Sequence, residues 1–201
     1  MLVYIMRHGY TEWNKLQKLQ GSSDIELNEE GRKLARTTGE GLKDIHFDVC
    51  YSSPLKRAVE TARLVLGDAD TPIITDERLR EMCFGVAEGV EKELQPPEVA
   101  VFFNDPGNYV PPERGETIEE LRARTADFIR KVIEPLSIEK PDANVLISGH
   151  GAMNKGGLIS YFREWGKEHF WDGPWQKNCC FCITEVKGKE HRILEEGKVY
   201  Y

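Results

Sequence analysis

The sequence predicts an α/β fold: a three-layer α/β/α sandwich whose mainly parallel sheet contains one antiparallel strand. The apolar runs Leu2–Met6, Phe47–Tyr51 and Asn144–Ser148 are typical of buried strands, and each precedes a loop and a segment with helical apolar spacing. Such alternation favours a parallel sheet between helices. Near the end of the chain, Cys179–Val186 and Arg192–Leu194 flank a Lys-Gly-Lys turn, which predicts a hairpin and hence the antiparallel strand.

The elements of the first half follow from caps and spacing. Asn28 is a good N-cap, and we expect a helix from about Asn28 to Lys43. After the second strand, Ser53 is expected to cap a helix with Pro54 at its first position, ending at Gly67. Pro72–Thr75 is expected to form a short strand.

The second half begins with a proline-rich excursion, Val90 to about Glu116, that carries a weakly helical patch at Glu98–Phe103. Such a segment suits a lid over the sheet better than a linker between domains. A long helix is expected over Ile118–Leu136, and a further helix should run from the glycines after Ser148 to about Phe162. The aromatic stretch Trp165–Trp175 has no regular pattern.

Length and composition favour one domain covering residues 1–201. The chain is 40% hydrophobic and 30% charged, which is ordinary for a globular protein, and no apolar run is long enough to span a bilayer. The net charge of −7 opposes binding to nucleic acid. We therefore expect a small anionic partner, with no nucleic acid and no membrane, and leave a homodimer open.

The cysteines argue for a reducing compartment. There are five, an odd number, and Cys179, Cys180 and Cys182 are crowded together, so no disulfide framework is indicated. No secretory leader is visible before the first strand, and we expect a cytoplasmic protein. A metal site made of these thiols with His169 or His191 is the alternative, but side chains alternate along a strand, so we expect no metal and no cofactor.

Candidate catalytic side chains follow four predicted elements. Arg7 and His8 end the first strand, Arg57 lies in a first helical turn, Glu81 follows the third strand, and His150 stands between two glycines. Taken singly, Arg57 and Glu81 are better explained as solvated surface residues. Because the carboxyl ends of parallel strands share one edge of the sheet, however, all five should meet. Guanidinium groups match phosphate oxygens, and an imidazole can act as a nucleophile, so a phosphorylated substrate is indicated.

The motifs and their order also resemble a known family. These motifs are Arg7-His8-Gly9 with Thr11-Glu12-Trp13-Asn14, Ser52-Ser53-Pro54-Leu55 with Arg57-Ala58 and Thr61-Ala62, Leu79-Arg80-Glu81 with Phe84-Gly85 and Glu88-Gly89, and His150-Gly151. Over essentially its whole length the chain resembles the histidine phosphatase superfamily, that is, the phosphoglycerate mutase-like family, in its phosphatase-type branch.

The resemblance implies a role for each of the five candidates. His8 would be the nucleophile that accepts the phosphoryl group, and Glu81 the proton donor. Arg7, Arg57 and His150 would bind the phosphoryl group as it is transferred.

Four more positions are assigned to substrate or phosphate binding. Asn14 matches a phosphate-contacting position of the family, Ser22 and Ser23 lie where the family's loop meets the substrate, and Gly151 follows the second histidine. Serines and backbone amides around Gly21 could also cradle an anion, although a plain turn explains them equally well.

The chemistry expected of these groups needs no metal. A neutral His8 would attack with one ring nitrogen while the other donates to a backbone carbonyl. Two guanidiniums and an imidazolium at His150 would stabilise the charge on the equatorial oxygens. Glu81 would protonate the leaving oxygen and then activate the water that hydrolyses phosphohistidine.

Two departures from the family pattern stand out. Gly149 precedes His150 where the family usually has serine, so Ser148 is displaced by one position and its hydrogen bond is in question. Ala87 stands where phosphatase-type members often carry tryptophan, which should remove an aromatic wall of the pocket.

The leading function is hydrolysis of a small phosphomonoester through a phosphohistidine intermediate. The first alternative is a cofactor-dependent phosphoglycerate mutase, an isomerase that returns the phosphoryl group to its substrate. It is disfavoured because Met82-Cys83-Phe84 and the acidic stretch from Glu88 to Glu93 lack the basic insertion such enzymes carry. The second alternative is a noncatalytic binding or regulatory protein, although a binder has no use for both a nucleophile and an acid.

Overall fold

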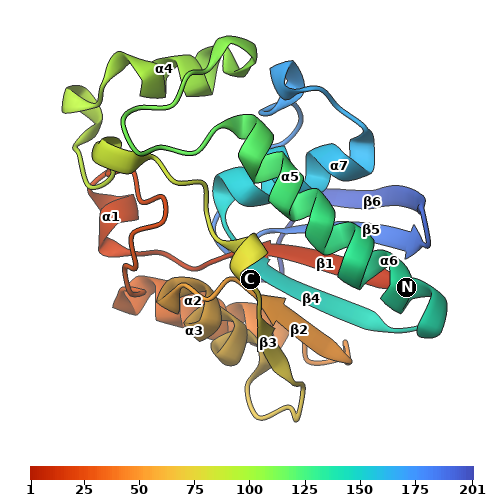
Figure 1. The fold of residues 1–201 in the computed structure, drawn as a ribbon. Helices are drawn as coiled ribbons and strands as arrows, with labels where there is room; N and C mark the ends of the chain where they lie inside the picture. Colours follow the sequence, from red (N-terminus) through yellow and green to blue (C-terminus); the bar gives the residue numbers. More distant parts are fainter.

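A six-stranded mixed sheet organises the computed structural model, which describes all residues from Met1 to Tyr201 (Figure 1). Its strand order is β3-β2-β4-β1-β5-β6. The strands are β1 (Leu2–Arg7), β2 (Val49–Ser52), β3 (Ile73–Thr75), β4 (Asn144–Gly149), β5 (Phe181–Lys187) and β6 (Glu190–Lys198). Only β5 runs against the others, since it pairs antiparallel with both β1 and β6. The predicted fold class, including the single antiparallel strand and the hairpin, is confirmed.

Helices cover both faces of the sheet. They are α1 (Glu12–Lys15), α2 (Glu29–Gly41), α3 (Lys56–Leu66), α4 (Pro97–Asn104), α5 (Ile118–Phe128), α6 (Glu134–Glu139) and α7 (Ser160–Arg163), with π-helical turns at Ile129–Ile133 and Met153–Ile159. Because side chains alternate along a strand, Val3 and Ile5 of β1 face the larger core beneath α5, whereas Tyr4 and Met6 face the smaller core beneath α2 and α3.

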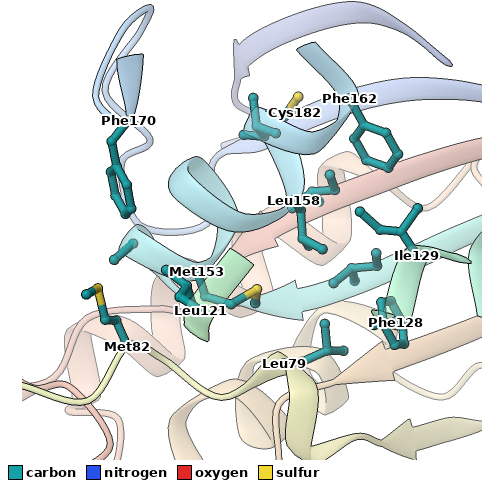
Figure 2. Close-up of a cluster of buried hydrophobic side chains, with 14 of the residues drawn as sticks. Leu79, Met82, Leu121, Phe128, Ile129, Met153, Leu158, Phe162, Phe170 and Cys182 are labelled. Carbon is teal, nitrogen blue, oxygen red and sulfur yellow. The ribbon is translucent and has the colours of Figure 1, made fainter. Parts of the chain in front are cut away.

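The larger core joins the sheet to the second half of the chain. Figure 2 shows Phe128 and Ile129 from the α5 region gathered with Leu158 and Phe162 around the strands. Phe170 packs against the same cluster and is fully buried.

The helix after β2 begins later than the sequence predicts. Pro54 does not take the first helical position: α3 starts at Lys56, with Leu55 as an N-cap that makes no side-chain hydrogen bond. Ser53 is used differently, because its hydroxyl accepts from the amide of Leu55. The strand before it is also shifted, to Val49–Ser52.

The predicted long helix over Ile118–Leu136 exists but is not uniform. It runs as α5, a π-helical turn at Ile129–Ile133 and α6, ending at Glu139. Pro135 lies just after the π turn, and a proline has no amide hydrogen for the regular helical ladder. A π-helical turn, which has extra residues, accommodates the hydrogen bond that the proline cannot make.

The excursion after Val90 folds around an aromatic cluster. Phe102 of α4 is fully buried and packs edge-on against Phe84 and Phe170, with ring centroids 5.1 and 5.0 Å apart. The indole nitrogen of Trp171 donates to the carbonyl of Phe102 at 2.9 Å. The excursion and the aromatic stretch Trp165–Trp175 therefore pack against each other.

The crowded cysteines do not converge. Cys179 faces the smaller core and Cys182 the larger one, on opposite sides of the sheet. Burial raises the pKa of each of these two thiols to about 12, so both are protonated packing residues. No helix combines the length and apolar character needed to cross a membrane.

Truncating Phe128 should test the larger core. The ring is fully buried and contacts Tyr51 edge-on at 5.4 Å between centroids. We expect Phe128→Ala to lower the free energy of unfolding by about 3–5 kcal/mol, measured by urea denaturation. Ile138→Ala, at a position 66% exposed, is the matched control and should stay within about 0.5 kcal/mol. A loss below about 1 kcal/mol for Phe128→Ala would contradict this core.

Candidate active site

Two histidines meet where the central strands end. In the register of β1 and β4, Arg7 lies opposite Gly149, so His8 and His150 leave neighbouring strands side by side. The amide of His8 donates to the carbonyl of Gly149 at 3.0 Å, and the two imidazole centroids are 5.2 Å apart. Both rings are buried, with His8 3% exposed and His150 fully enclosed.

The contacts of His8 fix its tautomer. Its Nδ1 lies 2.7 Å from the carbonyl oxygen of Gly9, which can only accept, so Nδ1 carries the proton. The Nε of Arg57 donates to His8 Nε2 at 3.3 Å, so this nitrogen keeps its lone pair. The expected hydrogen bond to a backbone carbonyl is confirmed, and neither ring nitrogen faces a carboxylate.

The pKa of His8 is lowered well below its usual value, first by burial and then by the charges of Arg57 and Arg7. The ring is therefore neutral at neutral pH. Nucleophilic attack requires a neutral imidazole with a lone pair on the attacking nitrogen, and here that lone pair, on Nε2, accepts a hydrogen bond from Arg57.

Arg57 connects the histidine to the loop after α1. Its two terminal nitrogens donate to the carbonyls of Ser23 and Gly21, at 2.6 and 2.7 Å. Burial lowers the pKa of Arg57 to about 10, which leaves it charged at neutral pH. The residue is thus no solvated helix arginine but the centre of the site.

Arg7 and His150 carry buried donors without protein partners. The Nε of Arg7 and both ring nitrogens of His150 make no hydrogen bond. One terminal nitrogen of Arg7 is used, since it donates to the carbonyl of Gln176 at 2.9 Å. Unpaired buried donors are costly, so atoms converging in this way indicate a site for an anion.

The surroundings of His150 disfavour the imidazolium that we expected at this position. Burial, followed by the charges of Arg57 and nearby cations, lowers the pKa of His150 well below its usual value. Its ring is therefore neutral at neutral pH. The fixed positive charge of the site comes from Arg7 and Arg57.

Glu81 reaches the same site from the segment after β3. Its carboxylate accepts hydrogen bonds from the amides of Met82, Ala152 and Met153, at 2.9, 3.1 and 2.8 Å. The last two amides belong to the first turn of the helix that follows His150, so this helix fixes the orientation of the carboxylate. A Cβ at Gly151 would lie 3.6 Å from Arg7 and 3.8 Å from Glu81, which places Gly151 between these groups.

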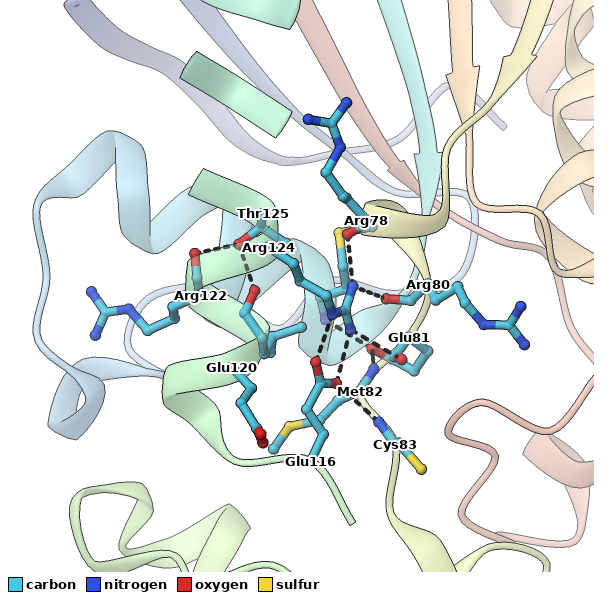
Figure 3. A network of polar contacts seen from close by, with 12 residues as sticks. Arg78, Arg80, Glu81, Met82, Cys83, Glu116, Glu120, Arg122, Arg124 and Thr125 are labelled. Atoms are coloured by element: carbon cyan, nitrogen blue, oxygen red, sulfur yellow. Dashed lines mark hydrogen bonds and ion pairs between the residues drawn. The ribbon is translucent and has the colours of Figure 1, made fainter. Parts of the chain in front are cut away.

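Arg124 of α5 holds the backbone that carries Glu81. Its guanidinium donates to the carbonyls of Arg78 and Arg80, at 2.6 and 2.7 Å, and to that of Glu81 at 3.2 Å (Figure 3). Glu116 anchors it in turn, with a 2.6 Å bond from Arg124 Nε. This partly buried network holds the backbone of Glu81, and it couples residues 78–81 to Glu116 and α5.

Asn14, Ser22 and Ser23, which the resemblance assigned to substrate or phosphate binding, make hydrogen bonds within the protein. The side chain of Asn14 forms a capping box with Thr11 at the start of α1. Both serine hydroxyls and both serine amides are occupied by Glu88, which they hold through its two carboxylate oxygens. Burial alone would raise the pKa of Glu88, but these bonds and one from Phe84 outweigh it and lower the pKa. Glu88 is therefore an ionised clamp on the loop that Arg57 also holds.

The two departures from the family pattern have clear outcomes. The hydroxyl of Ser148 donates to the carbonyl of Ala58 at 2.8 Å, so it ties β4 to α3. Ala87 is fully buried in the larger core. At this position the chain therefore has a small side chain packed in the core and no aromatic ring beside the site.

Several positioning residues escaped the sequence analysis. The side-chain amide of Asn178 donates to the carbonyls of His8 and Gly9, at 2.8 and 3.1 Å. The hydroxyl of Thr61 accepts from the amide of Gly9 at 2.9 Å and donates to the carbonyl of Arg57 at 2.6 Å. Thr61 already stood in a quoted motif, but Asn178 lies 170 residues from His8 with no local signal.

Known proteins share this sequence and fold. A family model described as the histidine phosphatase superfamily (branch 1) matches residues 3–197. The uncharacterised phosphatase PhoE of Bacillus subtilis is 39% identical over 150 residues, which cover 75% of this chain and 72% of that protein. A 2,3-bisphosphoglycerate-dependent phosphoglycerate mutase of Cytophaga hutchinsonii is 35% identical, with 75% and 72% covered.

A solved structure extends the likeness to the whole chain. Bacillus stearothermophilus YhfR superposes with a TM-score of 0.88 at 32% identity, and the match covers 98% of this chain and 97% of YhfR. Sequence and structure thus agree from the first strand to the last, and the chain belongs to the histidine phosphatase superfamily.

Proposed function

We propose that this protein is a metal-independent phosphatase that hydrolyses a small phosphomonoester through a phosphohistidine intermediate on His8. The observation that carries the proposal is the neutral, tautomer-fixed His8, whose Nε2 faces Arg57 beside the unpaired donors of Arg7 and His150. Phosphatases and phosphoglycerate mutases among the relatives support the same class of chemistry.

In the first step the lone pair of His8 Nε2 attacks phosphorus, and the bond from phosphorus to the ester oxygen breaks. Glu81 gives its proton to the departing oxygen, so the product leaves as an alcohol. In the second step the ionised Glu81 takes a proton from water as the water oxygen attacks phosphorus. The nitrogen–phosphorus bond breaks, and phosphate leaves with His8 and Glu81 restored.

The cationic groups have one task in both steps. Charge spreads over three equatorial oxygens during phosphoryl transfer, and catalysis consists mainly of holding and neutralising them. Arg7 and Arg57 supply two fixed positive charges, and the enclosed His150 adds a hydrogen bond from a ring nitrogen. Arg7 and Arg57 are already oriented by hydrogen bonds to protein carbonyls, so their guanidiniums reorganise little during the reaction.

Mutase activity is the second candidate because relatives carry that name. It requires groups that bind the substrate carboxylate and exclude water from the phosphohistidine. The residues that follow Glu81 include Met82 and Phe84, both buried in the core, and no basic residue stands between Glu81 and Val90. Hydrolysis is therefore the function we propose first.

A phosphomonoester panel tests this choice. With chelator present, we expect release of inorganic phosphate from alkyl and aryl phosphomonoesters. With 3-phosphoglycerate and a bisphosphoglycerate primer, phosphate release should exceed formation of 2-phosphoglycerate. Faster isomerisation than hydrolysis would instead assign the protein as a mutase.

Replacing His8 should abolish turnover. We expect His8→Ala to lower kcat by about 10³-fold or more, because the proposed covalent intermediate forms on its Nε2. Labelled substrate quenched in alkali should leave phosphate on wild-type protein and none on the variant. His46→Ala, at an exposed histidine, is the control and should retain both activity and label. Undiminished turnover by His8→Ala would remove the covalent mechanism.

Glu81→Gln should separate the two proton transfers. We expect kcat on alkyl phosphomonoesters to fall by about 10²–10⁴-fold, because a poor leaving group needs the acid. With p-nitrophenyl phosphate, whose leaving group needs no proton, phosphohistidine should form and then accumulate. An unchanged rate on alkyl substrates would exclude the role, and thermal unfolding of the variant checks that the site is still folded.

The two buried histidines should make folding pH-dependent. Their folded pKa values lie well below 6.5, so below that pH the unfolded chain binds protons that the folded chain does not. Their contribution to the free energy of unfolding is therefore complete above about pH 6.5. Below that pH the free energy of unfolding falls by up to about 1.4 kcal/mol per pH unit for each histidine. His150→Asn should reduce the slope between pH 6.5 and 5.5, measured by urea denaturation at each pH. An identical slope in wild type and variant would contradict the depressed pKa.

A further inference from the structure

A second cavity lies between α5, α7 and the turn that joins β5 to β6. Its volume is about 480 Å³, a size that suits a small ligand, and none of the five candidate catalytic residues lines it. The β5–β6 turn lies at the end of the sheet where β1 begins, because Leu2 of β1 pairs with Glu185 of β5. His8 follows the opposite end of β1, so this cavity is separate from the phosphoryl site.

Three cationic side chains line this cavity. Arg122 comes from α5, Arg130 from the π-helical turn after it, and Lys189 from the β5–β6 turn. None of the three forms an ion pair with the protein, whereas Lys131, next to Arg130, pairs with Asp127 at 2.7 Å. In a chain with a net charge of −7, unpaired cations around one cavity favour an anionic ligand.

A buried donor of His191 also borders the cavity. The side chain is 9% exposed, and its Nε2 is buried without a hydrogen bond. This nitrogen lies 3.5 Å from Oε1 of Glu134, and because a carboxylate oxygen only accepts, Nε2 is the ring nitrogen that carries the proton. Oε1 already accepts from the hydroxyl of Tyr161 at 2.8 Å. The proton of His191 is therefore left for an acceptor that the protein does not supply.

The positive charges are spread along the cavity. Arg122 and Arg130 stand eight residues apart on one helical stretch, so their backbones are about 12 Å apart at 1.5 Å per residue. Figure 3 shows the guanidinium of Arg122 turned away from Glu81. An anionic group at each end of a ligand would reach both arginines more readily than one compact anion.

The rest of the lining favours the same shape of ligand. Glu134 and Glu164 belong to it, so the cations exceed the carboxylates only by three to two. A ligand whose negative charge is divided between two ends can keep each end beside a cation and away from these carboxylates. Tyr161 and Trp165 supply the apolar surface that the middle of such a ligand would contact.

We propose that this cavity binds a small dianion made of two carboxylate groups joined by a short apolar chain. One carboxylate would approach Arg122. The other would approach Arg130 and Lys189 and accept the unused proton of His191, which lies near Arg130 because both contact Tyr161. The proposal does not depend on the phosphatase function.

The imidazole NMR signals of the protein test the site. The chain has five histidines, and His191→Gln identifies the signal of interest. We expect adipate to shift the His191 signal to saturation and to leave those of His8 and His150 unchanged. Monomethyl adipate, which has the same length and one charge fewer, should bind about 10-fold more weakly, because its second end makes no ionic contact. Inorganic phosphate, a compact dianion, should also bind about 10-fold more weakly at His191.

Charge-removing variants test the cations. We expect Arg122→Gln and Lys189→Gln each to weaken adipate binding by about fivefold at low salt. Lys33→Gln, at an exposed position of α2 outside the cavity, removes the same charge and should leave the affinity unchanged. Arg122 also donates to the carbonyl of Trp165, so thermal unfolding checks that variant, while the exposed Lys189 keeps the test independent of folding.

The contrary outcomes are distinct. A shift confined to His8 and His150 would place adipate at the phosphoryl site and overturn the second site. Equal affinity at His191 for adipate and its monomethyl ester, or for adipate and phosphate, would overturn the two-ended ligand. An unchanged affinity in both variants would overturn the role of the cations.

Discussion

The site depends on one guanidinium. Arg57 donates to His8 Nε2 with one nitrogen and to the carbonyls of Gly21 and Ser23 with the other two. This single group keeps a lone pair on the nitrogen that would attack phosphorus, contributes to the low pKa of the ring, and closes the loop over the strand end. Because it is buried, its charge acts through little intervening water. The geometry of the site is therefore set before any substrate arrives.

Loops carry most of the site, and buried ion and hydrogen-bond networks give them the rigidity that loops usually lack. Glu88 accepts hydrogen bonds from the amides of Ser22 and Ser23 and so fixes the loop after α1. Arg124 pins the backbone of Glu81 from α5. Both residues act through hydrogen bonds to main-chain groups, which fix a position whatever side chain the loop carries. The candidate catalytic groups come from segments far apart in the chain and are thereby held in one arrangement.

The sheet supplies the frame of the site, and the excursion packs beside it. Alternating side chains of the central strands fill a core on each face, so the strand ends and the histidines they carry cannot shift independently. The excursion with α4 and the aromatic stretch before β5 pack on each other through Phe102 and Trp171. Their outer surface lines a cleft through Phe103 and Trp175.

The sequence by itself determined the α/β class, the strands of the parallel core, the hairpin, and the five side chains that meet at the sheet edge. Those features depend on local apolar periodicity and on motifs at strand ends, both of which can be seen within a few residues. Only the tertiary structure decided that Glu88 accepts hydrogen bonds from Ser22 and Ser23 and that Arg124 positions Glu81. The same holds for the hydrogen bond from Asn178 to the carbonyl of His8 and for the neutral state of His150. Partners of this kind are distant in the sequence, and a pKa depends on burial and on charges that only the folded chain brings together.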